Sequence, residues 1–532
     1  MKLTLIAALV AAPLTAALPA DKSTLNPTML HVLKADDYRP YIDGFNRNDN
    51  ELYKGFFPNA EAWGFLNDNI PFLDCPDKDI ERAYYFRWWT FRKHIRQTPA
   101  GWLIDEFLPN VPWAGKYNSI NCAAAHHIHE GRWLRDPKYL DDYDSFWFGK
   151  GGDAGRYSFW VADSIWARYC VTGDRSEAMR LLPDLIANYA SWEKSHRDAN
   201  GLYWQRDDRD GMEDSISGKL HPHQLGYRVT INSYQFGDAR AIAQIAELAG
   251  KPEVALEYRK KAGAIKELVQ GRLWDPDAKF FKVLPRIENA HLADVRELHG
   301  YTPWYFDLPD HSFAVAWKQA MDPKGFFSSF GLTTAEQRHP KYALSYAGHE
   351  CEWDGPIWPF STSVTLTGLA NLLNGPKQDV IGPREYFDLL KIYAKSQCRT
   401  LEDGRVVPWI DEDQNPVDGD WMARTVLIKN GSKIPERGKD YNHSTFCDLV
   451  ISGLIGLRPR PDDTVEVNPL VPKSWDYFCL DGIPYHGRSI AILWDRTGMR
   501  YGRGKGLRVF SDGREIASSD KVGSLTGHLS PY

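Results

Sequence analysis

Residues 238–270 read DARAIAQIAELAGKPEVALEYRKKAGAIKELVQ, and this stretch predicts two helices joined by a tight turn. In its first half, apolar residues such as Ile245 and Leu248 recur at the spacing of one helix face. Gly250 and Pro252 then separate the helices, because glycine favours the position after a helix and proline favours a first turn. The stretch therefore predicts a helical hairpin.

The same pattern of helix, short turn and helix continues from about residue 78 to residue 457. Pro183 lies inside one segment and would either kink that helix or mark its true start. The segments share no motif of fixed period, which excludes a simple solenoid. Further helices are expected at residues 175–196, 357–374, 384–399 and 444–457.

The C-terminal part, residues 458–532, changes character. Apolar and polar residues alternate there, which is the pattern of half-buried strands. Asp512-Gly513 is a strong signal for a hairpin turn. The alternation is seen in TVEVNP (464–469), SIAILW (489–494) and GLRVFSDGREI (506–516). We expect a mainly α protein, with a large helical domain over residues 21–457 and a small antiparallel β-domain over residues 458–532.

The composition of the 532 residues is that of a globular protein, with 25% charged residues and a net charge of −6. The absence of a basic excess argues against nucleic acid as a partner. The chain contains 20 tryptophans. This is more than a core requires, and flat aromatic rings stack well on the apolar faces of sugars. The composition therefore raises carbohydrate as a candidate partner.

The first 20 residues resemble a secretory signal peptide. Lys2 precedes an apolar run, and small residues around Ala20 offer cleavage sites. We expect a secreted, extracellular protein, or a periplasmic one in a bacterium. No later stretch reaches 18 consecutive apolar residues, so we expect no membrane partner. Asn430 and Asn442 begin glycosylation sequons that a eukaryotic host would use.

The cysteines and histidines suggest neither a disulfide framework nor a metal. Seven cysteines are few for this length, and their odd number leaves at least one thiol free. His126, His127 and His129 are spaced by one and two residues, which does not place ligands on one helix face, and no HExxH motif is present. We therefore expect no metal and no cofactor.

Acidic residues cluster beside tryptophans in three loops. Hydrolysis of a glycosidic bond needs two carboxyl groups, one as an acid and one as a base or nucleophile. The first loop contains Asp207, Asp208, Asp210, Glu213 and Asp214 after Trp204; the second contains Glu350, Glu352 and Asp354 around Trp353 and Trp358; the third contains Asp411, Glu412 and Asp413 after Trp409. The loops thus combine the groups that a glycosidase needs.

Three motifs in these loops resemble the inverting glycosidases built on an (α/α)6 barrel. These are the six-hairpin glycosidases, including trehalase, the glycoside hydrolase family 63 α-glucosidases and mannosylglycerate hydrolase. The motifs occur in the family's order, as GMEDS (211–215), WDGPIW (353–358) and EDQNPVDG (412–419). The resemblance covers residues 80–457. It implies an (α/α)6 toroid barrel followed by the β-domain.

Carried over onto these motifs, the resemblance implies that Glu213 is the general acid and Glu412 the general base. The match has two departures, since Glu213 stands where the family has Asp and Gln414 stands where it has Tyr. Asp214 remains a competing acid and Asp440 a competing base. The implied reaction is single-step inversion, with the two carboxyl groups about 6.5–9.5 Å apart. It is expected to be exo-acting on an oligosaccharide or glycan side chain.

Residues beside the acidic motifs are the candidates for sugar binding. Aromatic rings would stack on the sugar, and polar side chains would bind its hydroxyl groups. The candidates are Trp113, Trp204, Arg209, Asp210, Trp353, Asp354, Trp358 and Trp409.

Three other functions remain open. A phosphorylase on the same barrel would need a phosphate pocket, for which Arg424 and Lys429 are available. A polysaccharide lyase would need Tyr or His near a residue that neutralises a uronate. A secreted glycan-binding protein would need no catalytic carboxyl groups, although it explains paired acidic loops poorly. The sequence leaves the oligomeric state open.

Overall fold

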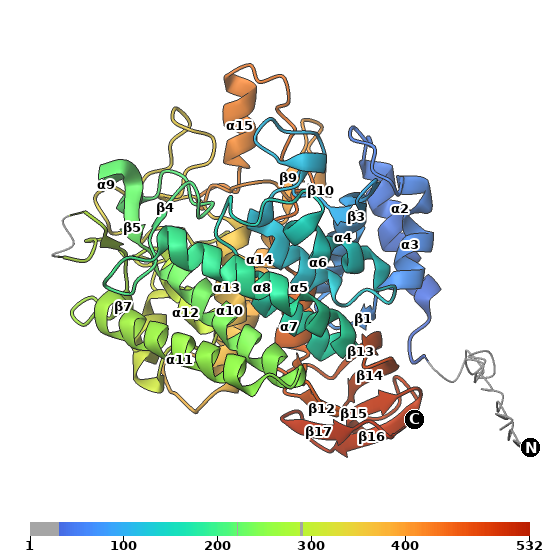
Figure 1. Cartoon of the computed structure of the whole chain (residues 1–532). Helices are drawn as coiled ribbons and strands as arrows, with labels where there is room; N and C mark the ends of the chain where they lie inside the picture. Colours follow the sequence, from blue (N-terminus) through green and yellow to red (C-terminus); the bar gives the residue numbers. More distant parts are fainter. Residues whose placement is uncertain (1–30, 221, 288–290, 532) are drawn as a thin grey trace, which may run out of the picture.

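The computed structural model describes residues 31–220, 222–287 and 291–531, so the expected signal peptide at residues 1–20 lies outside the described residues. The described chain is mostly helical, with antiparallel sheet at its C-terminal end (Figure 1). Its α-helices are α2 (Arg39–Asn48), α3 (Ala62–Asn69), α4 (Lys78–Lys93), α5 (Ala124–Gly131), α6 (Lys138–Gly149), α7 (Val161–Thr172), α8 (Arg175–His196), α9 (Ile216–Leu220), α10 (Val229–Leu248), α11 (Pro252–Leu268), α12 (Thr302–Tyr305), α13 (Pro359–Asn374), α14 (Pro383–Ser396) and α15 (Met422–Lys429).

The helices differ in how many of their faces are buried. α10 and α13 are buried along most of their length and on almost every side. By contrast, α8, α11 and α14 bury one face and expose the other. A helix that is surrounded on all sides belongs to the core of a large domain, whereas an amphipathic helix covers that core. The helical part therefore has inner and outer helices.

The predicted hairpin over residues 238–270 is confirmed. It consists of the C-terminal half of α10 followed by α11, and these two helices pack against each other. Gly250 has a φ of +69°, a left-handed conformation that suits glycine. Pro252 lies in the first turn of α11, where its missing N–H costs no hydrogen bond. The turn between the two helices thus forms at the glycine and proline from which the sequence predicts it.

Helix α8 has the predicted bounds and continues through Pro183. Its start is fixed by Asp174, whose side chain accepts a hydrogen bond from the Ser176 backbone N–H over 2.9 Å. Pro183 is exposed, so the ring lies on the outer side of the helix. It therefore does not mark the start of this helix.

The helix predicted over residues 444–457 is shorter than expected. Helical structure begins at Cys447 and ends in a π-helical stretch at Leu449–Leu454. The Glu130 carboxylate fixes this start, because it accepts hydrogen bonds from the backbone N–H groups of Phe446, Cys447 and Asp448. A buried carboxylate thus caps the helix from a distant segment, which helical spacing alone does not reveal.

The C-terminal strands form two antiparallel sheets. The five-stranded sheet has the order β1-β13-β14-β15-β16 and takes its edge strand β1 from the N-terminal part of the chain. Asp512 and Gly513 both have positive φ and make the predicted hairpin turn. The strands are β1 (Phe72–Asp74), β13 (Tyr477–Tyr485), β14 (Arg488–Asp495), β15 (Gly506–Ser511) and β16 (Arg514–Ser519), with β11 (Leu457–Arg458), β12 (Thr464–Val467) and β17 (Leu525–His528) in the second sheet.

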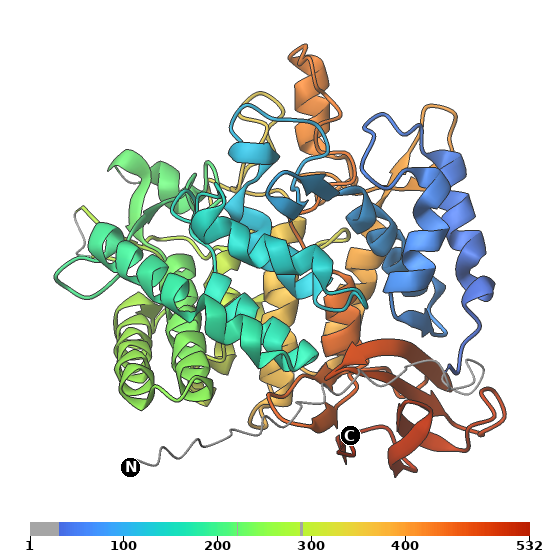
Figure 2. The same cartoon turned by 45° about the vertical axis from the view of Figure 1, so that its right-hand side comes forward.

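Short strands stiffen the loops between helices in the rest of the molecule. They are β2 (Ile95–Thr98) with β3 (Gly101–Ile104), β4 (Gln205–Arg206) with β5 (Leu225–Tyr227) and β8 (Leu284–Pro285), β6 (Trp274–Asp275) with β7 (Phe280–Phe281), and β9 (Cys398–Thr400) with β10 (Val406–Pro408). In Figures 1 and 2, the C-terminal sheets lie at one end of the molecule and α15 lies at the other.

The two sequons differ in accessibility. Asn430 is exposed, whereas Asn442 is buried and its side-chain amide donates a hydrogen bond to the Asp105 carbonyl oxygen over 3.1 Å. Burial therefore excludes modification of Asn442 in the folded protein. All seven cysteines lie within the described residues and carry free thiols. Among the described helices, none is long and apolar enough to cross a lipid bilayer.

Candidate active site

Backbone hydrogen bonds join the three motif loops into one unit. The Trp353 backbone N–H donates to the Glu213 carbonyl oxygen over 3.0 Å, which ties the second motif to the first. Ile357 and Gln414 exchange two backbone hydrogen bonds of 2.8 Å, which tie the second motif to the third. Segments that are far apart in sequence are therefore fixed against one another.

A pocket of about 400 Å³ opens at this junction. Both predicted catalytic residues, Glu213 and Glu412, line it. The wall also contains aromatic rings, two thiols and several charged groups, the mixture typical of a small-molecule site. Its other lining residues are Glu106, Phe107, Trp113, Ile120, Cys122, Arg156, Tyr157, Asp208, Arg209, Gly211, His349, Glu350, Cys351, Trp358, Phe360, Arg437, Tyr441 and His443.

Glu213 is placed to remain protonated at neutral pH. Burial raises the pKa of Glu213 to about 8, and the negative charges of Asp207 and Asp208 act in the same direction. The turn before it depends on Gly211, whose φ is +70° and whose missing Cβ would lie 2.5 Å from the Cys122 sulfur. There is therefore no room for a side chain at position 211, where the acidic loop turns.

Glu412 is held by a paired cation. The Arg437 guanidinium donates from Nε to Oε1 over 2.7 Å and from Nη2 to Oε2 over 3.1 Å. Cys351 also donates from its thiol to Oε2 over 3.0 Å, and burial raises the pKa of that thiol, which keeps its proton in place. Both members of the bidentate pair are buried. Glu412 is thus oriented from two sides.

The competing carboxylates do not line this pocket. Asp214 has a φ of 56°, and its charge acts on Lys219, Glu352 and Asp354, which do not include a pocket-lining catalytic candidate. Asp440 is buried and forms an ion pair with Lys93. Position therefore favours Glu213 and Glu412 over their neighbours.

Three of the eight predicted sugar-binding residues line the pocket, namely Trp113, Arg209 and Trp358. Trp353 instead lies behind Trp358, with the two rings stacked at 4.6 Å. Asp354 is turned away and pairs with Lys219 over 2.8 Å. The second motif thus places one tryptophan in the wall and uses the other to support it.

The remaining three predicted contacts lie elsewhere. Trp204 does not line the pocket and is covered by the Arg286 guanidinium, 3.9 Å from the ring centre. Trp409 is buried and donates its indole N–H to Asp411 over 3.2 Å. Each ring thus contacts a polar side chain of the protein itself and lies outside the set of residues that line the pocket.

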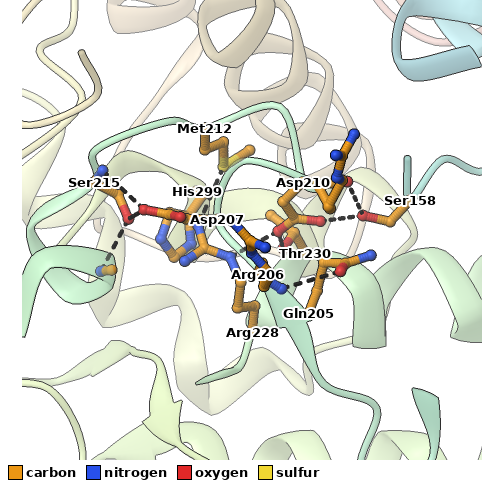
Figure 3. A network of polar contacts seen from close by, with 12 residues as sticks. Ser158, Gln205, Arg206, Asp207, Asp210, Met212, Ser215, Arg228, Thr230 and His299 are labelled. Atoms are coloured by element: carbon orange, nitrogen blue, oxygen red, sulfur yellow. Dashed lines mark hydrogen bonds and ion pairs between the residues drawn. The ribbon is translucent and has the colours of Figure 1, made fainter. Parts of the chain in front are cut away.

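Asp210, the third of these, belongs to a buried polar network beneath the first motif (Figure 3). It accepts hydrogen bonds from Ser158, Thr230 and the Arg228 Nε, the last over 2.8 Å. Next to it, the Asp207 carboxylate accepts from the backbone and hydroxyl groups of Ser215, over 3.2 and 3.1 Å. These contacts hold the loop on both sides of Glu213, so Asp210 supports the site from below.

Sequence reasoning missed several pocket residues. Glu106, Tyr441 and His443 line the pocket from segments outside the three motifs. Glu106 lies in the loop 102–118, whose tryptophans and acidic residues resemble those of the motif loops, and this was the available signal. Cys351 lies within the second acidic loop, between Glu350 and Glu352, whereas Arg437 carried no such signal, because its role depends on contact with Glu412.

The histidine run lies on α5 and faces the core. His127 is wedged between the Tyr143 hydroxyl, 2.7 Å from Nδ1, and the Asn442 carbonyl oxygen. His126 packs edge-on against Phe360, with ring centres 4.6 Å apart. Within the described residues, no group of three or more His, Cys, Asp and Glu side chains could hold a metal ion.

Comparisons with known proteins show what this chain is similar to. A solved structure named sialidase is 44% identical, with a TM-score of 0.87, over 94% of this chain and 45% of that chain. Mannosylglycerate hydrolase from Thermus thermophilus, solved with glucose, is 16% identical over 61% of this chain and 95% of its own, with a TM-score of 0.45. An uncharacterised protein of Borreliella burgdorferi is 25% identical over 149 residues, 27% of this chain.

This chain spans less than half of the sialidase-named chain and 30% of the Borreliella protein. Residues 457–517 match the C-terminal domain of glycosyl hydrolase family 65. Residues 116–444, more than half of the chain and most of the pocket wall, match the mannosylglycerate hydrolase MGH1-like glycoside hydrolase domain. The protein therefore belongs to this MGH1-like family of glycoside hydrolases, within the six-hairpin glycosidase superfamily.

Proposed function

We propose that the protein hydrolyses a glycosidic bond in one step with inversion, using Glu213 as general acid and Glu412 as general base. One observation carries this proposal: the two carboxyl groups line the same pocket in different environments. Glu213, with a pKa of about 8, keeps its proton, whereas Glu412 is bound by the Arg437 guanidinium. A carboxyl group that keeps its proton suits the acid role, and a carboxylate that is held in place by a fixed cation suits the base role, which supports this assignment.

In the proposed reaction, Glu213 donates its proton to the leaving oxygen. Glu412 accepts a proton from a water molecule that attacks the anomeric carbon from the opposite face. Trp113 and Trp358 flank the sugar from the pocket wall. The product has the opposite anomeric configuration. Glu213 then takes up a proton from solvent and Glu412 releases one, which returns both carboxyl groups to their starting states.

Three further parts of the proposal rest on the family and the sequence. The arrangement of inner and outer helices supports an (α/α)6 barrel over residues 21–457, with the β-domain at 458–532. A pocket of about 400 Å³ accommodates the end of a glycan chain, which supports exo-action. The leader-like residues 1–20 support secretion.

The test is a panel of glycosides, with the first product anomer followed by NMR. The panel includes sialosides, because one similar structure is named sialidase. Inversion is expected, and retention would overturn the mechanism. Adding inorganic phosphate separates hydrolysis from phosphorolysis, since a phosphorylase requires phosphate for turnover.

Variants assign the two roles. Glu213→Gln and Glu412→Gln should each lower kcat about 10²–10⁴-fold, the usual contribution of a general acid or base. Glu402→Gln, the same change at an exposed site, is the matched control and should leave kcat unchanged. If Asp214→Asn loses activity while Glu213→Gln keeps normal kcat, the general acid is Asp214 and not Glu213. If Asp440→Asn loses activity while Glu412→Gln keeps normal kcat, the general base is Asp440 and not Glu412.

A further inference from the structure

Buried polar atoms at one end of the pocket lack hydrogen-bond partners. Among the described residues, Glu106 Oε2 and both ring nitrogens of His443 are such atoms. Both residues line the pocket, although Glu106 is only 6% exposed and His443 only 4%. Buried polar groups in proteins almost always have a partner, because an unsatisfied group costs about 1–3 kcal/mol. These three atoms therefore point to a ligand.

Tyr441 joins the two residues into one cluster. Its hydroxyl donates a hydrogen bond to Glu106 Oε1, and its ring centre lies 3.7 Å from that of His443. The Trp358 and Phe360 rings lie 5.7 and 5.9 Å from the His443 ring. Aromatic packing on several sides thus fixes the directions of the unpartnered nitrogens.

The backbone holds the cluster together as well. The Asn442 backbone N–H donates to the Glu106 carbonyl oxygen over 3.2 Å, so the segment after β3 and the segment before the π-helix are joined at the pocket. His127 contacts the Asn442 carbonyl oxygen from the other side. The cluster is therefore formed before a ligand arrives, which reduces the entropy lost on binding.

The cluster is electrically neutral at neutral pH. Burial raises the pKa of Glu106 to about 8 and lowers the pKa of His443 well below its usual range. The nearby Arg437 cation is already paired with Glu412 and Glu350. A neutral carboxylic acid and a neutral imidazole each contain a donor and an acceptor, as a sugar hydroxyl does. The cluster itself thus contains no charged group that could pair with a charged substituent, and the other cations that line the pocket, Arg156 and Arg209, come from different segments.

We propose that Glu106 and His443 bind hydroxyl groups of an uncharged glycosyl residue, and so select neutral sugars over uronic acids and amino sugars. This inference rests on the proposed glycosidase function, because it names the sugar whose bond Glu213 and Glu412 cleave. Both residues are assigned to specificity and not to proton transfer.

The experiment measures binding, so that it remains separate from turnover. Calorimetric titrations of the full chain use glucose, mannose, galactose, rhamnose and arabinose as neutral probes. Glucuronic acid, galacturonic acid, glucosamine and galactosamine are the charged probes. At least one neutral sugar is expected to bind at least tenfold more tightly than any charged one. Tighter binding of a charged sugar, or binding of no neutral sugar, would overturn the proposal.

Variants then locate the binding. His443→Phe keeps a flat ring without nitrogens. It should weaken the binding of the best neutral sugar about tenfold or more, because one or two hydrogen bonds are lost. Glu106→Gln keeps a donor and an acceptor and should stay within about threefold of the parent. His311→Phe, at an exposed position, is the matched control.

Unchanged affinity in His443→Phe would overturn the assignment. If that variant does not fold, Glu106→Leu provides the same comparison, because it removes both polar atoms while retaining an apolar side chain. Failure of the proposed mechanism is recognised separately. Retention of configuration, or normal turnover in Glu412→Gln, would refute the catalytic roles without changing the binding results.

Discussion

Removal of the Arg437 guanidinium should destabilise the protein by about 3–5 kcal/mol, the usual cost of leaving one buried partner of an ion pair. Arg437 and Glu412 are 6% and 1% exposed at their side chains, so water replaces little of the lost interaction. The second carboxylate partner, Glu350, is 23% exposed and is expected to contribute far less. Arg437→Met is the variant, since methionine retains most of the apolar volume.

The assay is urea unfolding followed by tryptophan fluorescence, with Arg437→Met compared with the double variant Arg437→Met/Glu412→Gln. The double variant leaves no unpaired charge and should recover at least half of the lost free energy of unfolding. It should remain inactive, because it lacks the proposed base. A loss below about 1 kcal/mol in the single variant would refute the reasoning. No recovery in the double variant would refute it equally.

Two further predictions concern Glu213 and the backbone near Glu412. Activity should fall above about pH 8, because a general acid with a raised pKa is protonated below that value and ionised above it. Asp207→Asn removes a negative charge that raises this pKa, so the alkaline limb of kcat/KM against pH should move to lower pH; an unmoved limb would contradict this. Gly438→Ala places a Cβ 1.9 Å from Asp411 Oδ1 and should cost about 1–3 kcal/mol, with loss of activity. Gly263→Ala, where no atom lies within 4 Å, is the control for unfolding measurements and should not destabilise the protein.

The sequence predicted the elements whose signals are local. The α10–α11 hairpin, α8 and the β15–β16 turn depend on helical spacing, capping residues and turn residues, all of which are close together in the chain. The helix predicted over residues 444–457 was wrong in extent because its cap is the side chain of Glu130, from a distant helix. Long-range capping leaves no pattern in the sequence.

The candidate site was predicted unevenly for a similar reason. Motif order located Glu213 and Glu412, which do line one pocket. Proximity in sequence did not reveal orientation, so Trp204 and Trp409 were assigned to a wall that they do not reach. Arg437 was overlooked because nothing in its neighbourhood in sequence indicates a partner on another loop. The catalytic roles themselves remain predictions.

Strand β1 gives the chain an order of assembly. Phe72 pairs with Asp481 and Asp74 with Cys479, so during synthesis this strand waits for a partner that lies far downstream in the chain. The Asp74 carboxylate also accepts hydrogen bonds from Arg500 and Tyr501, which emerge later still. Until residues 477–485 have been made, the edge of β1 has no neighbouring strand, and an unpaired edge is prone to pairing with other chains. Strand β1 thus completes its pairing only after residues far downstream of it have been made.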